Sequence, residues 1–499
     1  MYLRRTLHRL ATAFACLTLT LTIALAQTAK RPLNHHDYDS WRTITGQRLT
    51  NDGKFLAYSL FPEEGDGEVV IRNLVTGQET RIPAGARPVA PAAATDEEEG
   101  PPVQRGVTIE FSADSKTVVF STFPSKAETA KARKDKKTTD QMPKDAMMIV
   151  DLASGRQTRI ERVRRFAMPL KGDSYLAYSR EAPEGQGAAA KPPDNGNDAG
   201  DQQAGRGGRG GRGGGGGRGG GGGARLQFGT DLVLRSLTDA TERTFPDAAE
   251  FSLSEDGKQL VYAVSAHDTA KNGVFMVAIG TNNAPVALLD GKGKYLKLTW
   301  DENQSELAFL SDKDDAASKP SKFKLYRWDR KAPTASELVS AATPGFHKDF
   351  VISENGALSF SKDGKHVYFG CALPVPEKKD DPAADPTEEK AVVDLWSYKD
   401  EYLQPAQKLR AGRDRNRTFM AAYSIPDHKL IQLADEQLET VTPSENTQWV
   451  LGTDDRDYRK ANDYDEHYSD TYLIDTATGT RKLLAKKHTG QVSFSPNGR

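Results

Sequence analysis

The densest group of side chains that could do chemistry lies near the end of the chain, between positions 454 and 470. Its acidic and imidazole members are Asp454, Asp455, Asp457, Asp463, Asp465, Glu466, His467 and Asp470. Clustered carboxylates can bind Ca²⁺. The order D-x-[DN]-x-[DN]-G of an EF-hand loop is absent, however, and Arg456, Arg459 and Lys460 can pair with the acids. A solvated, ion-paired loop is therefore favoured over a metal site or a site for a substrate amine.

Three tyrosines are interleaved with these acids, namely Tyr458, Tyr464 and Tyr468. A tyrosine buries a large ring and keeps a polar hydroxyl at its end. These side chains could therefore shape the wall of a channel, or they could pack between neighbouring structural units.

Two further candidate sites are weaker. Cys371 follows the apolar run HVYFG, and a buried or half-buried small hydrophobe is the favoured interpretation. The side chains of the adjacent His35 and His36 diverge, so a solvated pair is favoured over a metal site. The H-E-x-x-H, C-x-x-C and P-loop patterns are missing from the sequence. We assign no catalytic, cofactor-binding or metal-binding residue.

The elements that must position these residues are short strands, because one phrase recurs along the chain. The clearest copy, Phe251–Tyr262 (FSLSEDGKQLVY), is an apolar strand, a polar turn at Asp256-Gly257 and a second apolar strand. Gly accepts the positive φ of such a turn, and β-branched and aromatic residues favour strands. Further copies lie at Leu49–Tyr58, Phe111–Phe120, Leu170–Ser179, Leu296–Asp312, Phe360–Phe369, Val441–Asp455 and Phe494–Arg499.

Each unit continues with two more short strands, which gives about four strands in roughly 40 residues, the spacing of a propeller blade. One such unit cannot bury both faces of its sheet, so neighbouring units must stack around an axis. The sequence thus predicts an all-β protein, a β-propeller of about seven or eight four-stranded blades over residues 46–499. The last copy stops inside its hairpin, so we expect the final blade to be truncated and the chain to be a fragment or a truncated product.

Several inserts interrupt the units. The Lys-rich stretch Lys126–Lys144 is expected to be a mobile loop between strands. The stretch 185–225 is a low-complexity Gly/Arg-rich insert within a unit, and it cannot build a packed core. Tracts of this kind can bind RNA, but this one has few arginines and no interleaved aromatic residues. A flexible loop is favoured, and no nucleic-acid partner is predicted.

The sixth unit is expected to contain an acidic insert at Glu377–Glu389, followed by strands at Val392–Tyr398 and Ala406–Leu409. An additional hairpin is expected at Thr418–Asp435.

The N-terminus has the pattern of a secretory signal. Three arginines precede the mostly apolar stretch Leu10–Leu25, and Ala24-Leu25-Ala26 predicts cleavage after Ala26. We therefore predict a signal peptide at 1–26, an N-terminal lead at 27–45, and a periplasmic or secreted protein with no membrane segment after cleavage. The mature chain would carry 65 basic and 69 acidic residues, since the signal removes three of the 68 basic ones. This near-neutral balance gives no general attraction to nucleic acid or anionic lipid.

The repeated phrase FSxDGKxLxY resembles the WD40-like repeats of TolB and of prolyl oligopeptidase-type (S9) serine peptidases. The stretches 35–83 and 452–479 look like parts of bacterial secreted members of that peptidase family. The resemblance implies a β-propeller that caps a C-terminal α/β-hydrolase domain. In this family the hydrolase domain cleaves short peptides with Ser, Asp and His, and the propeller excludes large folded proteins.

The sequence contains no G-x-S-x-G nucleophile elbow and no βαβ alternation. No catalytic residue of the family can therefore be placed on it, and the α/β-hydrolase domain is expected beyond residue 499. Glu63-Glu64 and Glu388-Glu389 resemble the paired glutamates that hold a peptide N-terminus in dipeptidyl peptidases of this family. Adjacent glutamates are common in charged loops, so this role is not transferred. No cofactor is predicted.

Three hypotheses on function follow. The first is the substrate-gating propeller of an exported serine peptidase, which acts on short peptides together with its own C-terminal hydrolase domain. The second is a stand-alone exported TolB-like propeller that binds a protein or a cell-envelope partner. The third and weakest is a sensor or an inactive relative. The chain alone is expected to be inactive as an enzyme.

Overall fold

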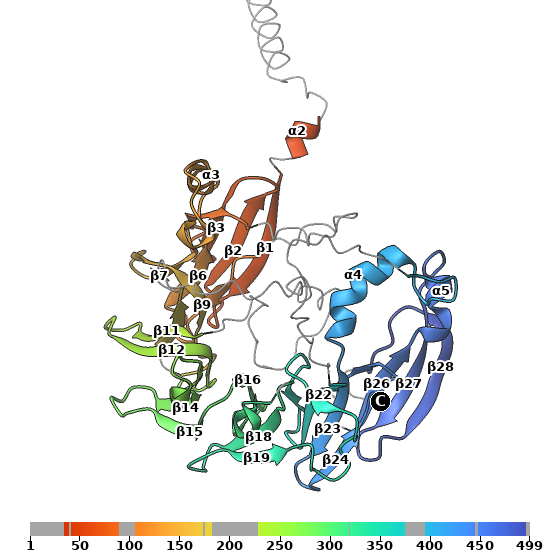
Figure 1. Cartoon of the computed structure of the whole chain (residues 1–499). Coiled ribbons are helices and arrows are strands. Elements are labelled where there is room, and N and C mark those ends of the chain that lie inside the picture. The colour runs from red at the N-terminus through yellow and green to blue at the C-terminus, as the bar shows by residue number, and fades with distance from the viewer. Residues whose placement is uncertain are drawn as a thin grey trace, which may run out of the picture.

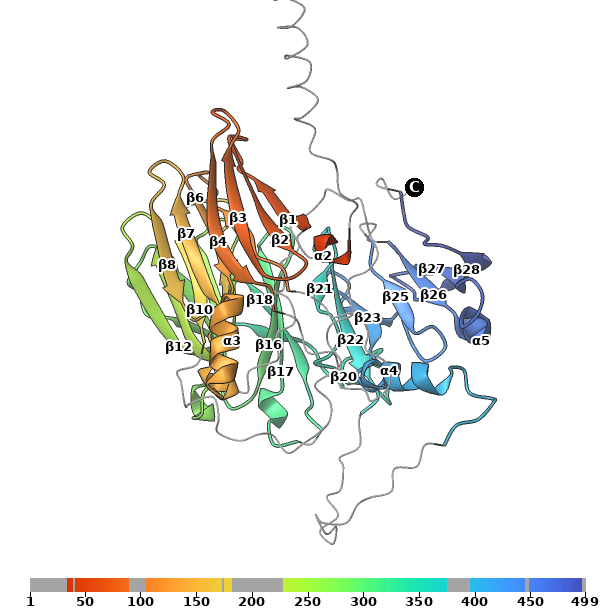
Figure 2. The same ribbon diagram turned by 90° about the horizontal axis from the view of Figure 1, so that it is seen from above.

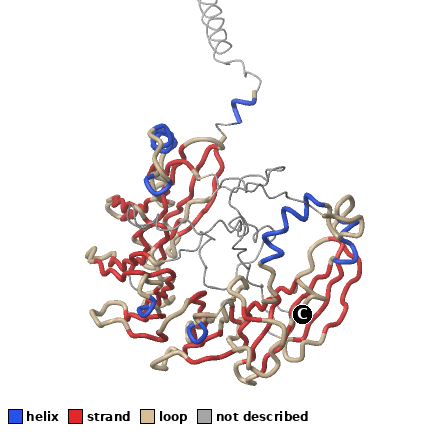
Figure 3. The backbone as a smooth tube through the Cα atoms, in the orientation of Figure 1, coloured by secondary structure: helices blue, strands red, loops and turns tan. Residues whose placement is uncertain are grey.

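The computed structural model describes eight stretches of the chain: residues 34–38, 41–88, 105–172, 175–181, 228–318, 320–374, 395–444 and 448–495. Several predictions fall outside them, namely the signal peptide, the Gly/Arg-rich tract, Glu388-Glu389 and residues 496–499. Figure 1 shows the described part as a series of antiparallel sheets that follow one another in chain order around an arc. Figure 3 shows that helices are short pieces between these strands.

The first two sheets each have four strands in sequence order. The first sheet contains β1 (Arg42–Leu49), β2 (Phe55–Pro62), β3 (Asp66–Asn73) and β4 (Glu79–Ala86). The second contains β5 (Ile109–Phe111), β6 (Thr117–Thr122), β7 (Ala146–Asp151) and β8 (Gln157–Glu161). The sheet thus begins at Arg42, inside the stretch expected as an N-terminal lead. That lead also holds the short helix α2 (His35–Tyr38).

The third sheet has seven strands. They are β9 (Val163–Ala167), β10 (Tyr175–Arg180), β11 (Thr230–Ser236), β12 (Glu242–Leu253), β13 (Gln259–Val264), β14 (Gly273–Ala278) and β15 (Val286–Asp290). β12 accounts for the larger number, because it pairs with β11 up to Ala248 and with β13 from there to Leu253. It therefore serves as the fourth strand of one set and the first strand of the next.

The remaining sheets return to the shorter pattern. The fourth sheet contains β16 (Tyr295–Trp300), β17 (Glu306–Ser311), β18 (Lys324–Asp329) and β19 (Ser336–Val339). The fifth contains β20 (Val351–Ile352), β21 (Ser359–Phe360), β22 (His366–Ala372), β23 (Phe419–Ser424) and β24 (Lys429–Gln432). The sixth contains β25 (Thr440–Thr442), β26 (Trp449–Asp454), β27 (Tyr468–Asp475) and β28 (Arg481–Thr489). β20 and β21 both pair with β22. The all-β propeller class is confirmed, while the number of blades stays a prediction.

The hydrophobic core lies between successive sheets. On β13, Leu260 and Tyr262 belong to the cluster shared with the strands before it, whereas Val261 and Ala263 belong to the cluster shared with β16–β18. Alternate residues of a strand point to opposite faces, so the middle strands are apolar on both sides. This explains why β13 shows a nearly continuous run of buried residues.

The recurring phrase builds one turn repeatedly, and the Ser254 copy shows its design. The buried Ser254 hydroxyl donates to Asp256 Oδ1 (2.6 Å) and accepts from Gln259 N (3.0 Å). Asp256 Oδ1 also accepts from Lys258 N (3.1 Å), and Gly257 takes a φ of 68°. A hydroxyl that both donates and accepts satisfies the turn's polar groups locally, as buried backbone requires.

Equivalent hydroxyl–carboxylate pairs recur in three other turns: Thr50–Asp52 (2.7 Å), Ser112–Asp114 (2.6 Å) and Ser361–Asp363 (2.7 Å). In the fifth unit, the carboxylate of Asp301 takes the hydroxyl's place and accepts from Ser305 N and Glu306 N, both at 2.7 Å. The residue with positive φ in this turn is Gln304, at 57°.

Two strands on either side of the Gly/Arg-rich tract in the sequence belong to one sheet. β10 and β11 pair directly from Tyr175↔Ser236 to Ser179↔Leu232. The predicted domain boundaries stay a prediction.

The prediction of a mobile loop for the Lys-rich insert is wrong. Instead of a mobile loop, it contains helix α3 (Lys126–Lys134) and the 3₁₀ turn η1 (Thr139–Gln141). The helix starts with a capping box, in which Ser125 caps the Glu128 amide and the Glu128 side chain returns to the Ser125 amide. The Ser-x-x-Glu pattern is a recognised helix start, and it outweighs the high charge of the stretch.

In the sixth unit, the prediction of strands after the acidic insert is wrong. Ala406–Leu409 is part of helix α4 (Gln404–Arg415), and residues 395–398 form no strand, while 392–394 lie outside the described residues. Pro405 suits the first turn of a helix, and Ala, Gln, Lys, Leu and Arg are strong helix formers. The expected additional hairpin, β23–β24, instead supplies the last two strands of this unit.

The turn design predicts a stability effect for Ser254→Ala. The change leaves Gln259 N without its acceptor and removes a donor from Asp256, so the free energy of unfolding should fall by about 1–2 kcal/mol. Urea unfolding monitored by tryptophan fluorescence measures the difference. The matched control is Ser252→Ala on the same strand, which should change stability by less than about 0.5 kcal/mol. Equal effects of the two changes would contradict the assigned role of the turn.

The same turn predicts a pH dependence for Asp256. Burial alone would raise the pKa of Asp256, but hydrogen bonds from Ser254, Lys258 N and Arg330 outweigh burial and lower the pKa. The resulting stabilisation is present above the unfolded-state pKa of about 4 and is lost as the pH falls through the lower folded-state value. Asp256→Asn should therefore destabilise the protein more at pH 7 than at pH 3 in urea unfolding. An equal penalty at both pH values would contradict this.

Candidate functional site

The predicted acidic group lies on the connection between β26 and β27. This connection folds into the 3₁₀ turn η4 (Arg456–Tyr458) and the short helix α5 (Arg459–Asn462). Asp454 binds the Arg456 guanidinium at 2.7 and 2.8 Å, and Asp455 binds Arg459 Nε at 2.9 Å. The prediction that arginines pair with these acids is confirmed. Lys460 instead donates to the carbonyl of Tyr398 (3.0 Å).

The other members of the group separate. Asp470 is buried on β27, where it accepts from Tyr458 Oη and Lys487 N, both at 2.7 Å. The exposed members are Asp457, Asp463, Asp465, Glu466 and His467. Within the described residues, no three His, Cys, Asp or Glu side chains gather as a metal site would require.

The three tyrosines also differ in role. Tyr458 and Tyr468 pack against each other, with ring centroids 6.3 Å apart. Tyr464 is 84% exposed. The hydrogen bond to Asp470 is the main cause that raises the pKa of Tyr458 to about 12, and burial contributes in the same direction. Tyr458 therefore remains a hydrogen-bond donor at neutral pH.

Arg459 is the centre of this region, and its side chain is 7% exposed. Besides Asp455, it binds Glu439 at 2.8 Å and pairs with Glu401. Burial alone would lower the pKa of Arg459, but the hydrogen bond to Glu401 and the nearby Asp455 outweigh burial and raise the pKa. The cation thus joins α5 to the segment before α4 and to the segment before β25.

A pocket of about 200 Å³ lies between α4 and α5. Figures 1 and 2 show the two helices side by side at one end of the arc. The pocket is lined by Tyr402, Ala406, Arg410, Asp455, Arg459, Asn462, Asp463 and His467. Asn462 forms a fixed part of the wall, because its side chain exchanges hydrogen bonds with the backbone of Tyr468 at 2.9 and 3.1 Å. This mixture of charged and polar side chains suits noncovalent binding of a small polar molecule.

Sequence reasoning found only the α5 half of this pocket. Tyr402, Arg410, Glu401 and Glu439 were missed because they lie near or in elements assigned as strands or left unassigned. Pro405, in the first turn of α4, was the available signal of a helix. Nothing local in the sequence indicates that Glu439 approaches Arg459, since 20 residues separate them.

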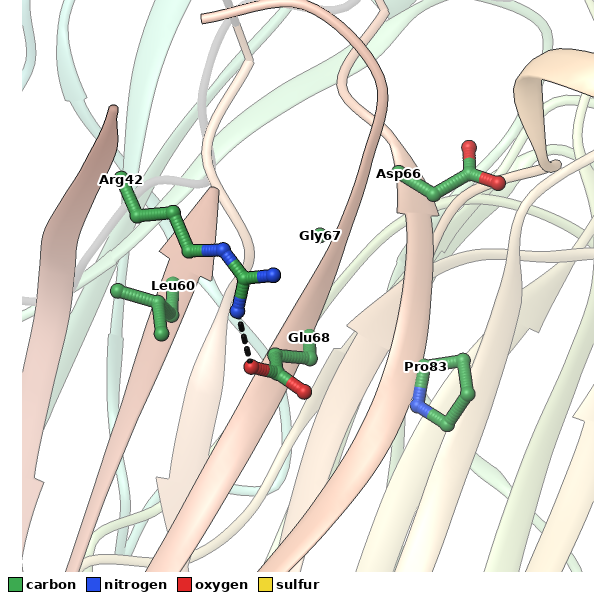
Figure 4. Close-up of a pocket in the computed structure, with 6 residues that line it drawn as sticks. All are labelled: Arg42, Leu60, Asp66, Gly67, Glu68 and Pro83. Carbon is green, nitrogen blue, oxygen red and sulfur yellow. Dashed lines mark hydrogen bonds and ion pairs between the residues drawn. The ribbon is translucent and has the colours of Figure 1, made fainter. Parts of the chain in front are cut away.

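A second pocket, of about 120 Å³, lies on the first sheet (Figure 4). Glu68 lies at its centre and binds Arg42 and Arg81, both at 2.8 Å. Asp66 accepts from the backbone N–H of Lys126 (2.8 Å). The Asp66 contact links the first sheet to the start of α3, and the charged groups that line the pocket already have partners within the fold. Glu64, from one predicted glutamate pair, forms an exposed ion pair with Lys126.

Cys371 is confirmed as a buried hydrophobe. It is fully buried on β22, and burial raises the pKa of its thiol to about 12. A thiol with this pKa is inert at neutral pH. Among the described helices, none combines the length and the apolar character needed to cross a bilayer.

The comparisons with known proteins found similar folds but no sequence relative. No protein-family model and no curated protein sequence matches the chain. The chain is similar to a prolyl endopeptidase structure at 12% identity and a TM-score of 0.36, covering 91% of this chain and 51% of that one. It is also similar to a eukaryotic initiation factor structure at 11% identity and a TM-score of 0.42, covering 92% and 80%.

A third similar structure is the β-propeller domain of the Trilobed protease from Pyrococcus furiosus, at 10% identity and a TM-score of 0.31, covering 90% of this chain and 100% of that one. The chain spans about half the length of the prolyl endopeptidase. Because the matched proteins include peptidases and an initiation factor, these similarities do not identify an activity.

The Arg459 centre predicts a destabilised α4–α5 region in Arg459→Met. The change leaves Glu401, Glu439 and Asp455 without their shared cation. The expected loss is about 2 kcal/mol, below the 3–5 kcal/mol of a fully buried pair because two of the three carboxylates are half exposed. Urea unfolding measures the loss, and limited proteolysis should cut near α4 faster. Arg413→Met, at an exposed arginine of α4, is the control and should change neither. Normal protection of α4 in Arg459→Met would contradict the proposed joint.

Proposed function

We propose that this chain is the substrate-gating propeller portion of an exported serine peptidase of the prolyl oligopeptidase family. In this proposal, short peptides are hydrolysed by a catalytic α/β-hydrolase domain beyond residue 499, and cleavage after Ala26 releases the protein into the periplasm or medium. The propeller narrows access to the catalytic domain, so that short peptides enter and folded proteins do not.

One observation carries the proposal: the two stretches that resemble secreted members of the family lie mostly in the first and the last of the described sheets. Residues 35–83 contain α2 and most of the first sheet, and residues 452–479 contain α5 and most of β26–β27. Each stretch therefore contributes strands to a sheet and adds a short helix beside them. The repeated turn supports the same assignment, since it is the structural form of the phrase on which the resemblance rests.

The chemistry within the chain fits a role in binding and access. The described pockets contain ion pairs and polar walls, and the buried thiol of Cys371 is protonated. Nucleophilic attack on a peptide carbonyl requires an activated Ser with a positioned His and a carboxylate. In the proposal, these groups belong to the catalytic domain.

The test is the intact mass of the native protein, measured together with labelling by a fluorophosphonate probe for serine hydrolases. We expect a labelled species far heavier than the 54.6 kDa of this chain, and an N-terminus that starts at Gln27. This chain expressed alone should not label.

An unlabelled native species at or slightly below 54.6 kDa would overturn the peptidase assignment. The alternative would then be a stand-alone exported propeller that binds a protein or cell-envelope partner. The exposed side chains of Leu395, Trp396 and Tyr398, at 91%, 66% and 85%, favour that alternative as a contact surface.

A further inference from the structure

The pocket between α4 and α5 contains a guanidinium with unused hydrogen-bonding capacity. Arg410 stacks on the ring of Tyr402, with its guanidinium carbon 4.0 Å from the ring centroid. Its nearest carboxylate is Asp414, whose oxygen is 3.8 Å from Arg410 Nε, beyond hydrogen-bonding distance. Within the described part of the chain, no group accepts a hydrogen bond from Arg410. The neighbouring Arg459, by contrast, uses three nitrogens to bind three carboxylates.

Stacking fixes the direction of the Arg410 guanidinium without consuming its N–H groups. A planar guanidinium held in this way presents a two-pronged donor to a carboxylate. Burial is the main cause that raises the pKa of Tyr402, and the negative charge of the nearby Asp455 raises it further. The Tyr402 side chain therefore remains neutral at physiological pH. The α4 wall of the pocket is therefore suited to an anionic group.

The opposite wall carries a free carboxylate. Asp463 follows α5 directly, lines the pocket and is exposed. Among the described cations, none forms an ion pair with Asp463, whereas the other lining acid, Asp455, is paired with Arg459. The remaining titratable lining group, His467, is exposed. A positive charge on a ligand would thus find Asp463 available.

We propose that this pocket binds a free α-amino acid, with the ligand carboxylate on Arg410 and the ligand ammonium at Asp463. Asp455 is already bound to Arg459, which leaves Arg410 on α4 and Asp463 after α5 as the oppositely charged lining groups with hydrogen-bonding capacity; Asp414 lies 3.8 Å from Arg410 Nε, too far for a hydrogen bond. A simple anion would be repelled by Asp463, and a simple cation would be repelled by Arg410. The zwitterion satisfies both.

The size of the pocket supports a small ligand. Its volume of about 200 Å³ is below the roughly 300–1,000 Å³ of sites for drug-sized molecules. One amino acid fits this space better than a folded segment or a long peptide. The inference depends on the pocket alone, so it holds both for a peptidase propeller and for a stand-alone binding propeller.

The experiment is isothermal titration calorimetry of the full chain with L-leucine. Two analogues that each lack one charge accompany it, 4-methylpentanoate without the ammonium and 3-methylbutylamine without the carboxylate. We expect L-leucine to bind and each analogue to bind at least about tenfold more weakly, because each loses one ion pair. Inorganic phosphate should also bind at least about tenfold more weakly than L-leucine.

Variants locate the site. Arg410→Gln and Asp463→Asn should each weaken L-leucine binding about tenfold or more. The matched controls are Arg413→Gln, an exposed arginine on α4, and Asp457→Asn, an exposed acid before α5; both should bind L-leucine normally. Circular dichroism establishes that all four variants are folded.

Two results would overturn the proposal. One is the absence of L-leucine binding up to about 10 mM, well above the concentrations at which weak specific sites fill. The other is phosphate binding as tight as that of L-leucine with no effect of Asp463→Asn, which would show a simple anion site. Fluorophosphonate labelling is independent of these results, so failure of the amino-acid site and failure of the peptidase assignment remain distinguishable.

Discussion

The fold depends on the buried hydroxyl–carboxylate contact in the recurring hairpin turn. A tight turn leaves backbone N–H groups that the ladder of the sheet cannot satisfy, and leaving such groups buried costs free energy. Ser254 with Asp256 solves this within six residues, and the same solution recurs in four other units with Thr, Ser or Asp in place of Ser254. Because these contacts are local, each copy of the phrase can close its turn with its own residues.

These turns also connect successive units. Asn51 of the first turn donates to the carbonyl of Ala113 in the second (3.0 Å). Arg330 of the fifth unit binds the carboxylate of Asp256 at 2.9 and 3.1 Å. The backbone N–H of Glu255 donates to Gln304 at 3.2 Å. Side chains of one turn thus also bind residues of the neighbouring unit. These bonds help to align the apolar faces of successive sheets against each other.

The sequence allowed the repeated part of the structure to be predicted, because a phrase such as FSLSEDGKQLVY contains its own turn chemistry and its own strand alternation. Helices α3 and α4 were assigned wrongly for different reasons. The Ser125–Glu128 capping box was visible in the sequence, but the high charge of the stretch was taken to indicate a loop. Ala406–Leu409 is too short to distinguish the period of a helix from that of a strand. The approach of Glu439 to Arg459 is a tertiary contact, and no local pattern encodes it.

The same contrast explains where binding chemistry occurs in this protein. In the repeated turns, the hydroxyl and carboxylate side chains already bind each other, the turn backbone or the next unit, so they have little capacity left for a ligand. In the connections that contain α4 and α5, Arg459 binds Glu401, Glu439 and Asp455. Beside it, Arg410 Nε has no hydrogen-bond acceptor and lies 3.8 Å from Asp414, and no described cation forms an ion pair with Asp463. Arg459 connects α5 to the segments before α4 and β25 through its bonds to Asp455, Glu401 and Glu439. The buried ion cluster therefore provides the rigidity, and the donors of Arg410 with the carboxylate of Asp463 provide the capacity to bind.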